Sequence, residues 1–394
     1  MKILFLSPRL PRGPSSPRKG DQARAYHLLE HLGKRHQITL LCFCDSDERD
    51  EDIVALNHIC YRVIAIPRSP WPGAKSAVLI LRGRPFQSAM YFRDKLKRRL
   101  EVLLAEEEID ILHVHTLRMA PYVENISAVP RVIDFVDALS LNFKRRAGRD
   151  AAMLKLLLLS EAHLLSRYER WLCSHMDRSA VSSQTDRNAI GDYRNLSVIR
   201  NGVDVDSFWR DTPRDDGTIV FAGTMDYFPN ADAVRFFAND VFPRVQRQIP
   251  GVRFRVIGSS PGAEIREMGK RSGVEIVGYI ADLAGALRSA TVAVCPTRTG
   301  SGTQFKILEA MAAETPVVAS SMAAQGLSAL GSTHLLTADD PDKFADAVVR
   351  LVRSPELQKR LASGARRFVE EEHSWKKSAD DMEELYVAAL KNRG

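Results

Sequence analysis

The sequence predicts an α/β protein made of two domains, each a doubly wound parallel sheet. Short apolar runs alternate with longer amphipathic stretches, as expected of parallel strands that are joined by crossover helices. This alternation starts again after residue 215. With 394 residues, the chain is also longer than one hydrophobic core usually supports, so two domains are expected.

The elements follow in order along the chain. In the first half, strands are predicted at 3–6, 38–43, 63–66, 109–114 and 131–136, with helices at 22–32 and 94–105 among them. In the second half, strands are predicted at 218–223, 252–258, 274–280, 290–296 and 316–320, with a helical stretch at 231–245. Residues 195–217 carry an Asn-Gly pair and a cluster of Asp, Pro and Gly, so they are expected to connect the halves. Three closing helices are predicted at 341–352, 355–371 and 375–391.

The composition indicates a globular protein with an anionic partner. Hydrophobic residues make up 45% of the chain and charged residues 27%, and the formal net charge is +7. That charge suits a phosphorylated small molecule, a lipid surface or nucleic acid. Nucleic acid is disfavoured because no aromatic stacking platform or recognised binding motif accompanies the charge. The five cysteines are scattered, so we expect buried thiols rather than disulfides or a metal site.

The apolar segments do not indicate a signal or a membrane span. The apolar start at 3–6 is shorter than a secretory signal needs, and the run at 153–165 is interrupted by Lys155 and Glu161. A cytoplasmic protein is therefore predicted. Basic clusters in the first half indicate either a solvated surface or docking on anionic lipid headgroups. They lie at 82–84, 95–99 and 144–146.

A glycine-rich turn before a helix is the main candidate for a binding site. In "GSGTQFKILEAMAA", Gly300 and Gly302 let the backbone approach a ligand, and the amides at the helix start suit a phosphate. Lys306 adds a positive charge, and Glu309, one turn later on the same face, can accept hydrogen bonds from sugar hydroxyls. An isolated Lys-x-x-Glu is most often a surface pair. The glycine turn and the strands on either side favour a diphosphate site here.

The same stretch carries a family resemblance. "GTQFKILEAMAAETPVV" resembles the signature helix of retaining glycosyltransferases of the GT-B fold, the large group 1 family (glycosyltransferase family 4). Other marks of the family recur in order: "KGDQARAYHLLEHL", "DILHVH", "VIRNGVDVDSF", "FAGTMDYFPNADAV", "VEIVGYIADL" and "HSWKKSADDMEELY". The combination of "AGTMDYFPNADAV" with "GSGTQFKILEAMA" also resembles a subgroup associated with bacterial exosortase and exopolysaccharide loci.

The resemblance implies a fold, a division of the chain and a reaction. The expected fold is GT-B, with two Rossmann-like domains facing a cleft: an acceptor-binding domain at 1–197 and a nucleotide-sugar-binding domain at 198–374. Residues 375–394 are expected to return as a helix to the first domain. The implied reaction is sugar transfer from a nucleotide-sugar donor with retention at the anomeric carbon, and the leaving phosphate assists the acceptor.

The resemblance also implies the residues of the site. His115, Lys306 and Glu309 are expected to be catalytic. The residues expected to bind the donor are Gly20, Thr224, Asn230, Gly278, Tyr279, Arg298, Gly302, Thr303, Gln304 and Phe305. The chain departs from the family at three positions, where Ser301 replaces a glutamate and Thr224 and Asn230 replace two phosphate-binding cations. We expect Lys306, aided by Arg298, to supply the missing charge.

In the first domain, "DILHVH" places His113 and His115 on one strand face. His115 is the better match to a family histidine near the transferred sugar, and a core role is the alternative, more so for His113. One histidine pair provides too few ligands for a metal, so no metal and no cofactor are expected. Asp137, after the next strand, is expected either to contact the acceptor or to cap a helix.

Taken together, the residues and the resemblance predict a glycosyltransferase acting on a glycan or lipid-linked acceptor in bacterial polysaccharide or glycolipid biosynthesis. The expected location is cytoplasmic, with peripheral contact on the inner face of the cytoplasmic membrane. Nucleic acid is not an expected partner. Two alternatives stay open at this point: a nucleotide-sugar epimerase of the same fold, and a non-catalytic protein that binds a sugar or a lipid.

Overall fold

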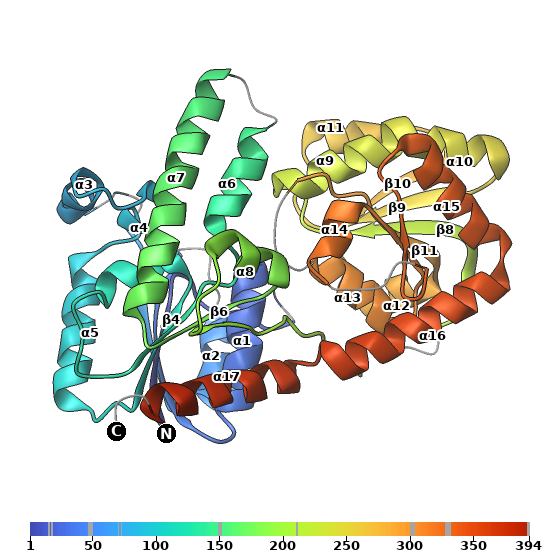
Figure 1. Cartoon of the computed structure of the whole chain (residues 1–394). Coiled ribbons are helices and arrows are strands. Elements are labelled where there is room, and N and C mark those ends of the chain that lie inside the picture. Colours follow the sequence, from blue (N-terminus) through green and yellow to red (C-terminus); the bar gives the residue numbers. More distant parts are fainter. Residues whose placement is uncertain are drawn as a thin grey trace. The chain divides into compact units, whose positions relative to one another are not determined.

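The computed structural model describes the chain except for residues 15, 17, 18, 46–49, 70, 72, 149–151, 210, 211, 300–303, 328–331 and 392–394. The chain forms two units, Met1–Arg200 with Trp375–Gly394, and Asn201–Ser374. Both are parallel-sheet α/β units with helices on the two faces of the sheet (Figure 1). The divisions predicted from the sequence are at 197 and 374, and the first of them lies three residues before the observed division at Arg200.

Unit 1 is built on a seven-stranded parallel sheet in the order β3-β2-β1-β4-β5-β6-β7. Its strands are β1 Lys2–Ser7, β2 Gln37–Cys44, β3 Arg62–Pro67, β4 Ile111–His115, β5 Arg131–Asp134, β6 Arg178–Val181 and β7 Leu196–Val198. Its helices are α1 Gly20–Leu32, α2 Asp50–Ile59, α3 Ala74–Leu81, α4 Phe86–Ala89, α5 Asp94–Glu106, the 3₁₀ helix η1 Leu117–Tyr122, α6 Leu139–Ala147, α7 Ala152–His175, α8 Gln184–Ile190 and α17 Trp375–Lys391.

The alternation of side chains along β1 explains how unit 1 buries both faces of its sheet. Successive residues of a strand point to opposite faces. Accordingly Ile3 and Phe5 pack in the cluster that includes residues of α1 and α17, while Leu4 and Leu6 pack in the cluster that includes residues of α5 and α7. A continuous apolar run is therefore required in β1, as the sequence has it.

Unit 2 is built on a six-stranded parallel sheet in the order β10-β9-β8-β11-β12-β13. Its strands are β8 Asp215–Ala222, β9 Arg253–Ile257, β10 Val274–Gly278, β11 Ala290–Cys295, β12 Val317–Ala319 and β13 Leu336–Thr337. Its helices are α9 Phe228–Phe236, α10 Phe242–Gln248, α11 Ala263–Met268, α12 Leu283–Ser289, α13 Phe305–Ala312, α14 Ser321–Gln325, α15 Pro341–Arg353 and α16 Pro355–Glu372, and a π turn, η2, spans Phe237–Val241.

Two sequence expectations need correction. The stretch at 231–245 is not one regular helix: the π turn η2 separates α9 from α10, which has Pro243 in its first turn. Proline lacks the amide hydrogen and crowds the preceding turn, so a regular helix cannot pass through it. Residues 195–217 are also not wholly a connection, because Leu196–Val198 forms β7 and pairs with β6. Three residues are too few for a sequence pattern to separate from a loop.

Both sheets reverse their strand order at one point, between β1 and β4 in unit 1 and between β8 and β11 in unit 2. In doubly wound sheets, ligands bind outside the carboxyl ends of the strands at this reversal. The residues that directly follow these four strands are therefore the ones that each unit presents to a ligand.

Candidate functional site

In unit 2, the strand reversal brings together the two segments that the sequence singled out. β8 ends at Ala222 and leads to Thr224 and Asn230, while β11 ends at Cys295 and leads to Arg298 and Gln304. β8 and β11 are hydrogen-bonded neighbours in the sheet. The two loops therefore leave the same edge of the sheet side by side.

Helix α13 directs one narrow face away from the core of unit 2. Ile307, Leu308, Ala310, Met311 and Ala312 are buried, and this apolar face fixes the helix on the sheet. Phe305, Lys306 and Glu309 are only half-buried. The exposed strip of α13 is therefore the strip that carries the predicted lysine and glutamate.

The start of α13 is the part of the candidate site best suited to an anion. Gln304 precedes the first turn and makes no side-chain capping hydrogen bond. Instead, Lys306 Nζ donates to Gln304 Oε1 at 2.9 Å and lies 5.9 Å from the ring centre of Phe221. Within the described part of the chain, no ion pair is formed by Lys306. The predicted residues Gly302 and Thr303, with Gly300 and Ser301, lie outside the described residues.

Arg298, expected to assist Lys306, has a carboxylate partner of its own. Its guanidinium donates to both oxygens of Asp232 on α9, at 2.6 and 3.2 Å. It also lies 4.6 Å from the ring centre of Phe236. Much of its charge is thus balanced within unit 2, and the positive charge at the start of α13 rests on Lys306. Nothing in the sequence indicated that Asp232 would pair with Arg298.

The turn after β8 is held tightly. Asn230 is 5% exposed, and its Nδ2 donates to the carbonyl oxygen of Thr224 at 2.9 Å. A Cβ on Gly223 would lie 2.7 Å from that Nδ2, and one on Gly258, after β9, would lie 1.8 Å from the Gly223 carbonyl oxygen. Both glycines are required for this close approach. Asn230 therefore shapes the turn that presents Thr224.

Exposed aromatic side chains gather after β8 and β10. Gly278 ends β10 with a φ of 81°, and the next residue, Tyr279, is 56% exposed. Tyr227 and Phe228, which precede and open α9, are exposed to a similar degree. Exposed aromatic rings suit stacking on a nucleobase or a sugar. Tyr227 and Phe228 were missed in the sequence analysis, although they stand in the quoted "MDYFPN" motif.

Ser320 braces the loop that leads to α13. Its hydroxyl donates to the carbonyl oxygen of Thr297 at 2.5 Å and accepts from the amide of Ala323 at 3.1 Å. It therefore caps α14 and also holds the loop after β11. Sequence reasoning missed this residue, although a serine directly after a strand is a common helix cap.

Replacing Ser320 with alanine is expected to lower the free energy of unfolding by about 1 kcal/mol, because both hydrogen bonds are lost. Equilibrium unfolding in urea measures the change. Ser321→Ala is the matched control, since Ser321 is the exposed next residue of the same helix. An equal loss of stability in the two variants would contradict the bracing role.

In unit 1, His115 lies at the strand reversal but is enclosed. It ends β4 and is 1% exposed. Its Nε2 donates to the carbonyl oxygen of Asp21 at 2.9 Å, and its Nδ1 lies 3.5 Å from Asp134 Oδ2. Gly20, the residue before Asp21, is exposed at the first position of α1. The structure thus brings the predicted glycine and histidine to one edge of the sheet.

His113 is a core histidine. It is fully buried, its ring stacks on Phe5 at 4.0 Å between centroids, and its Nδ1 shares a hydrogen bond of 2.8 Å with the hydroxyl of Tyr386 on α17. Burial lowers the pKa of His113 to about 3. A neutral ring that links β4 to α17 is a structural element, which was the alternative left open in the sequence.

His113, His115 and Asp134 offer ligand atoms within 4.8 Å of one another. These three ligand atoms do not suit a metal ion, because Arg24 on α1 donates hydrogen bonds to both oxygens of Asp134, at 2.7 and 3.3 Å. A metal ion here would lie against a guanidinium that is itself fully buried. Burial opposes ionisation of Asp134, but Arg24 and His115 outweigh it and keep its pKa well below the ordinary range. The cluster is a buried ion pair that orients His115.

A second group of buried carboxyls lies beside Asp137. Asp137 Oδ1 accepts from the Ser182 hydroxyl at 3.2 Å, and burial together with the charge of Asp186 raises its pKa to about 7. Glu169 accepts from the amide and the hydroxyl of Ser140, at 3.0 and 2.5 Å, and burial raises its pKa to about 7. Ala138, not Asp137, occupies the cap position of α6. A helix cap is one of the two roles that the sequence predicts for Asp137. The structure does not place Asp137 at the cap position of α6.

These raised pKa values predict that stability falls as pH rises. The folded state holds its carboxyl protons to a higher pH than the unfolded state, whose glutamates have a pKa of 4.5. The free energy of unfolding should therefore decrease between about pH 4.5 and about pH 7, by on the order of 1–3 kcal/mol for Glu169.

Urea unfolding across this pH range tests the prediction. Glu169→Gln, which cannot ionise, should flatten the fall. Glu101→Gln, on the exposed side of α5, is the control. An unchanged slope in Glu169→Gln would show that Glu169 ionises normally in the folded protein.

Sequence reasoning also missed a group of arginines at the same edge of unit 1. Arg9 follows β1, Arg68 follows β3, and Arg118 lies in η1 after β4. Arg9 donates a hydrogen bond to the Tyr91 hydroxyl at 3.2 Å. The guanidiniums of Arg68 and Arg118 lie within 5.5 Å of the Tyr91 ring centre. Arg9 pairs with Asp21 at 2.5 Å. Burial and the nearby charge of Arg9 lower the pKa of Arg118. Arg68 pairs with Asp45 at 2.7 Å, so Arg118 is the one of these three arginines without an ion pair to a described carboxylate.

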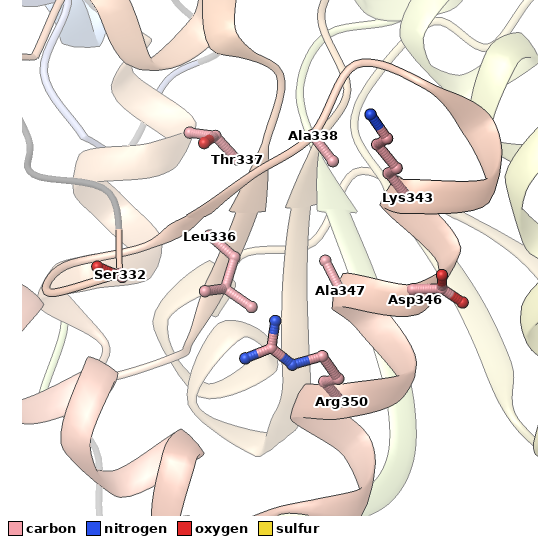
Figure 2. Close-up of a pocket in the computed structure, with 8 residues that line it drawn as sticks. All are labelled: Ser332, Leu336, Thr337, Ala338, Lys343, Asp346, Ala347 and Arg350. Atoms are coloured by element: carbon pink, nitrogen blue, oxygen red, sulfur yellow. The ribbon is translucent and has the colours of Figure 1, made fainter.

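A separate shallow hollow of about 460 Å³ lies in unit 2 between β13 and α15. Figure 2 shows Leu336 and Thr337 on one side of it and Lys343, Asp346 and Arg350 of α15 on the other. None of the predicted site residues lines it. A smaller hollow of about 360 Å³ includes Gly278 and the basic side chains of Arg266 and Lys270. The second hollow thus includes Gly278, the predicted donor-binding residue that ends β10.

Comparison with known families identifies the class of protein. A family model described as glycosyltransferase family 4 matches residues 19–207, and one described as glycosyl transferases group 1 matches residues 216–354. The chain is a glycosyltransferase of the group 1 type. This assignment supports an enzyme over a non-catalytic binding protein.

Two of the curated relatives of this glycosyltransferase are named for inositol compounds. The chain is 26% identical over 308 residues to the phosphatidyl-myo-inositol mannosyltransferase of Mycobacterium tuberculosis, and the alignment covers 73% of this chain and 76% of the relative. It is 27% identical over 198 residues to the D-inositol 3-phosphate glycosyltransferase of Frankia alni, covering 43% of this chain and 47% of the relative.

Solved structures give the glycosyltransferase the GT-B fold. Sucrose-phosphate synthase from Thermosynechococcus elongatus superposes with a TM-score of 0.75 at 17% identity, over 100% of both chains. Anabaena Alr3699/HepE in complex with UDP-glucose gives a TM-score of 0.67 at 15% identity, over 98% of both chains. At these identities the likeness concerns the fold.

A search of the described helices for a stretch with the length and apolar character of a membrane span found none.

Proposed function

We propose that this glycosyltransferase transfers a sugar from a nucleotide-sugar donor, held by unit 2, to an acceptor held by unit 1, with retention of the anomeric configuration. The observation that carries the proposal is the start of α13. It lies at the strand reversal of unit 2, has no side-chain cap, and carries Lys306 without an ion pair to a described carboxylate. Helix amides and a cation are the groups that bind a diphosphate.

In the proposed reaction, the bond between the sugar anomeric carbon and the diphosphate oxygen breaks as negative charge builds on the diphosphate. The start of α13 and Lys306 stabilise that charge. The acceptor oxygen bonds to the anomeric carbon on the face that the phosphate leaves, and its proton passes to a phosphate oxygen. Retention then needs no protein nucleophile, and the scheme uses no metal.

The other residues of unit 2 position the donor. Glu309, one turn after Lys306 on the half-exposed strip of α13, accepts hydrogen bonds from sugar or ribose hydroxyls. Tyr279 and Gly278 border the nucleobase, and the turn of Thr224 and Asn230 faces the diphosphate from β8. The UDP-glucose complex of Anabaena Alr3699/HepE, which has this fold, supports a nucleotide-sugar donor.

On the acceptor side, Arg118, which has no ion pair to a described carboxylate and lies beside Tyr91 at the same sheet edge as His115, favours an acceptor with an anionic group. The relatives named for phosphatidyl-myo-inositol and D-inositol 3-phosphate support an acceptor that carries a phosphate. A glycan or lipid-linked acceptor of bacterial polysaccharide or glycolipid biosynthesis fits this chemistry. The resemblance to exosortase-associated proteins favours exopolysaccharide among these pathways.

A thermal-shift screen of the full chain against UDP-, GDP-, ADP- and dTDP-sugars tests donor binding. A donor at a hundred times its dissociation constant should stabilise the protein by about 2.7 kcal/mol. The donor that shifts the unfolding temperature is then incubated with candidate lipid acceptors, and NMR of the product gives the anomeric configuration. A flat screen, or an inverted product, would contradict the proposal, and a free 2-epimer of the donor sugar would indicate an epimerase instead.

A further inference from the structure

We propose that unit 1 docks on an anionic lipid bilayer through exposed apolar residues of two segments, 71–86 and 154–159, which we call the apolar tip. The proposal goes beyond glycosyl transfer and does not depend on it. It commits to a bilayer surface with negatively charged headgroups as the partner.

The apolar tip holds most of the exposed large hydrophobic side chains of unit 1. Thirteen such residues are described in this unit, and nine of them belong to the tip. They are Trp71, Val78, Ile80, Leu81, Phe86, Leu154, Leu156, Leu157 and Leu159. Leu81 is 87% exposed and Trp71 is 79% exposed. Concentration of exposed apolar side chains in this way marks a surface that another phase or molecule covers.

The two segments form one surface because α4 packs on α7. Glu161 of α7 accepts from the amides of Phe86 and Gln87, at 3.1 and 2.9 Å. The guanidinium of Arg84 lies 4.9 Å from the ring centre of Tyr168 and 4.7 Å from that of Trp171, both on α7. Figure 1 shows α6 and α7 extending beyond the rest of unit 1. The contacts of Glu161 and Arg84 therefore fix α4 against α7, and the start of α7 projects from the unit.

The charge around the tip is strongly positive. The described residues of 71–94 and 138–161 hold eight Lys or Arg and two Asp or Glu, whereas the whole chain holds 56 and 49. Two of the eight, Lys75 and Arg84, pair with Asp94 and Glu124. Lys144, Arg146 and Lys155 are exposed beside the leucines of α7. Apolar side chains flanked by basic ones are the composition that binds the interface of an anionic bilayer.

The directions of the leucines favour a bilayer over a second protein chain. Successive residues of a helix point about 100° apart, so Leu154, Leu156, Leu157 and Leu159 point in four directions around α7. Leu158, between them, is buried. A rigid partner covers one side of a helix, whereas the fluid interface of a bilayer surrounds an inserted end. Exposure on several sides at once therefore fits lipid.

Co-sedimentation of the full chain with vesicles tests the proposal. Binding is expected to vesicles that contain phosphatidylglycerol, and to be much weaker with phosphatidylcholine alone. The double variant Leu156→Gln with Leu157→Gln should lower the partition coefficient by about ten-fold or more, since two side chains lose their burial in lipid. Lys144→Gln with Lys155→Gln should weaken binding to the anionic vesicles only.

Val54→Gln with Tyr61→Gln is the matched control, because these exposed apolar residues of unit 1 lie outside the tip. This variant should bind vesicles as the wild type does. Trp71 provides a direct probe: quenching by brominated lipid should be lost in Trp71→Phe. Light scattering without vesicles detects self-association.

Three outcomes overturn the proposal. The first is no binding to anionic vesicles, and the second is wild-type binding by the leucine variant. The third is a wild-type dimer that the leucine substitutions dissociate while vesicle binding stays unchanged. That result would assign the tip to a second copy of the chain.

Discussion

Lys306→Ala is expected to lower kcat by about a hundred- to a thousand-fold, the loss seen when one group that stabilises transition-state charge is removed. Lys306 makes no ion pair with a described carboxylate, and Asp232 balances the nearby Arg298. The variant therefore leaves the departing diphosphate without a free side-chain cation from α13. Steady-state kinetics with the donor found by thermal shift measure the effect.

Lys343→Ala is the matched control for Lys306→Ala. Lys343 lies on α15 of the same unit and lines the hollow between β13 and α15, apart from the predicted site (Figure 2). Its loss should leave kcat and KM unchanged. If Lys306→Ala retained more than about a tenth of the wild-type kcat, the leaving group would not depend on this lysine.

Asp134→Ala is expected to destabilise unit 1 by about 3–5 kcal/mol, because it leaves the guanidinium of Arg24 buried without its carboxylate. Arg24 and Asp134 are both fully buried and share hydrogen bonds of 2.7 and 3.3 Å. Urea unfolding, followed by circular dichroism, measures the change. His115 should also lose its orientation in Asp134→Ala. The kcat of this variant, measured at a low temperature at which it still folds, should therefore be lower than that of the wild type.

A double variant separates the ion pair from simple packing. Arg24→Met with Asp134→Leu removes both charges and should recover most of the stability lost in Asp134→Ala. Glu101→Ala, which removes an exposed i,i+4 partner of Lys97, should cost less than about 0.5 kcal/mol. A cost below about 1 kcal/mol for Asp134→Ala would mean that the buried guanidinium finds another partner.

The sequence predicted those parts of the fold that local patterns determine. The apolar runs that became β1, β2 and β11 are continuous because both faces of each sheet are covered, and the three closing helices have the amphipathic period of surface helices. Strand β7 was missed because three residues, Leu196–Val198, carry too little pattern. The π turn in 237–241 directly precedes α10 with its Pro243, and the period of apolar residues does not record a local change from α to π geometry.

The candidate site shows the same division. The glycine turn and α13 could be predicted because their chemistry is local: a turn, a helix start, and a lysine and a glutamate three residues apart. Pairing of Arg298 with Asp232, 66 positions earlier, could not be predicted without the fold. The same holds for Arg24 and Asp134, which are 110 positions apart, and for the arginines around Tyr91. Ion pairs between residues far apart in the sequence therefore determine which of the predicted cationic side chains can still bind a ligand.

The most direct test is a crystal structure of the full chain with the nucleoside diphosphate that gives the largest thermal shift. The account predicts the diphosphate at the first turn of α13, with Lys306 Nζ about 3 Å from a phosphate oxygen. A diphosphate bound elsewhere in the protein, or bound at α13 with Lys306 still directed only at Gln304, would contradict it.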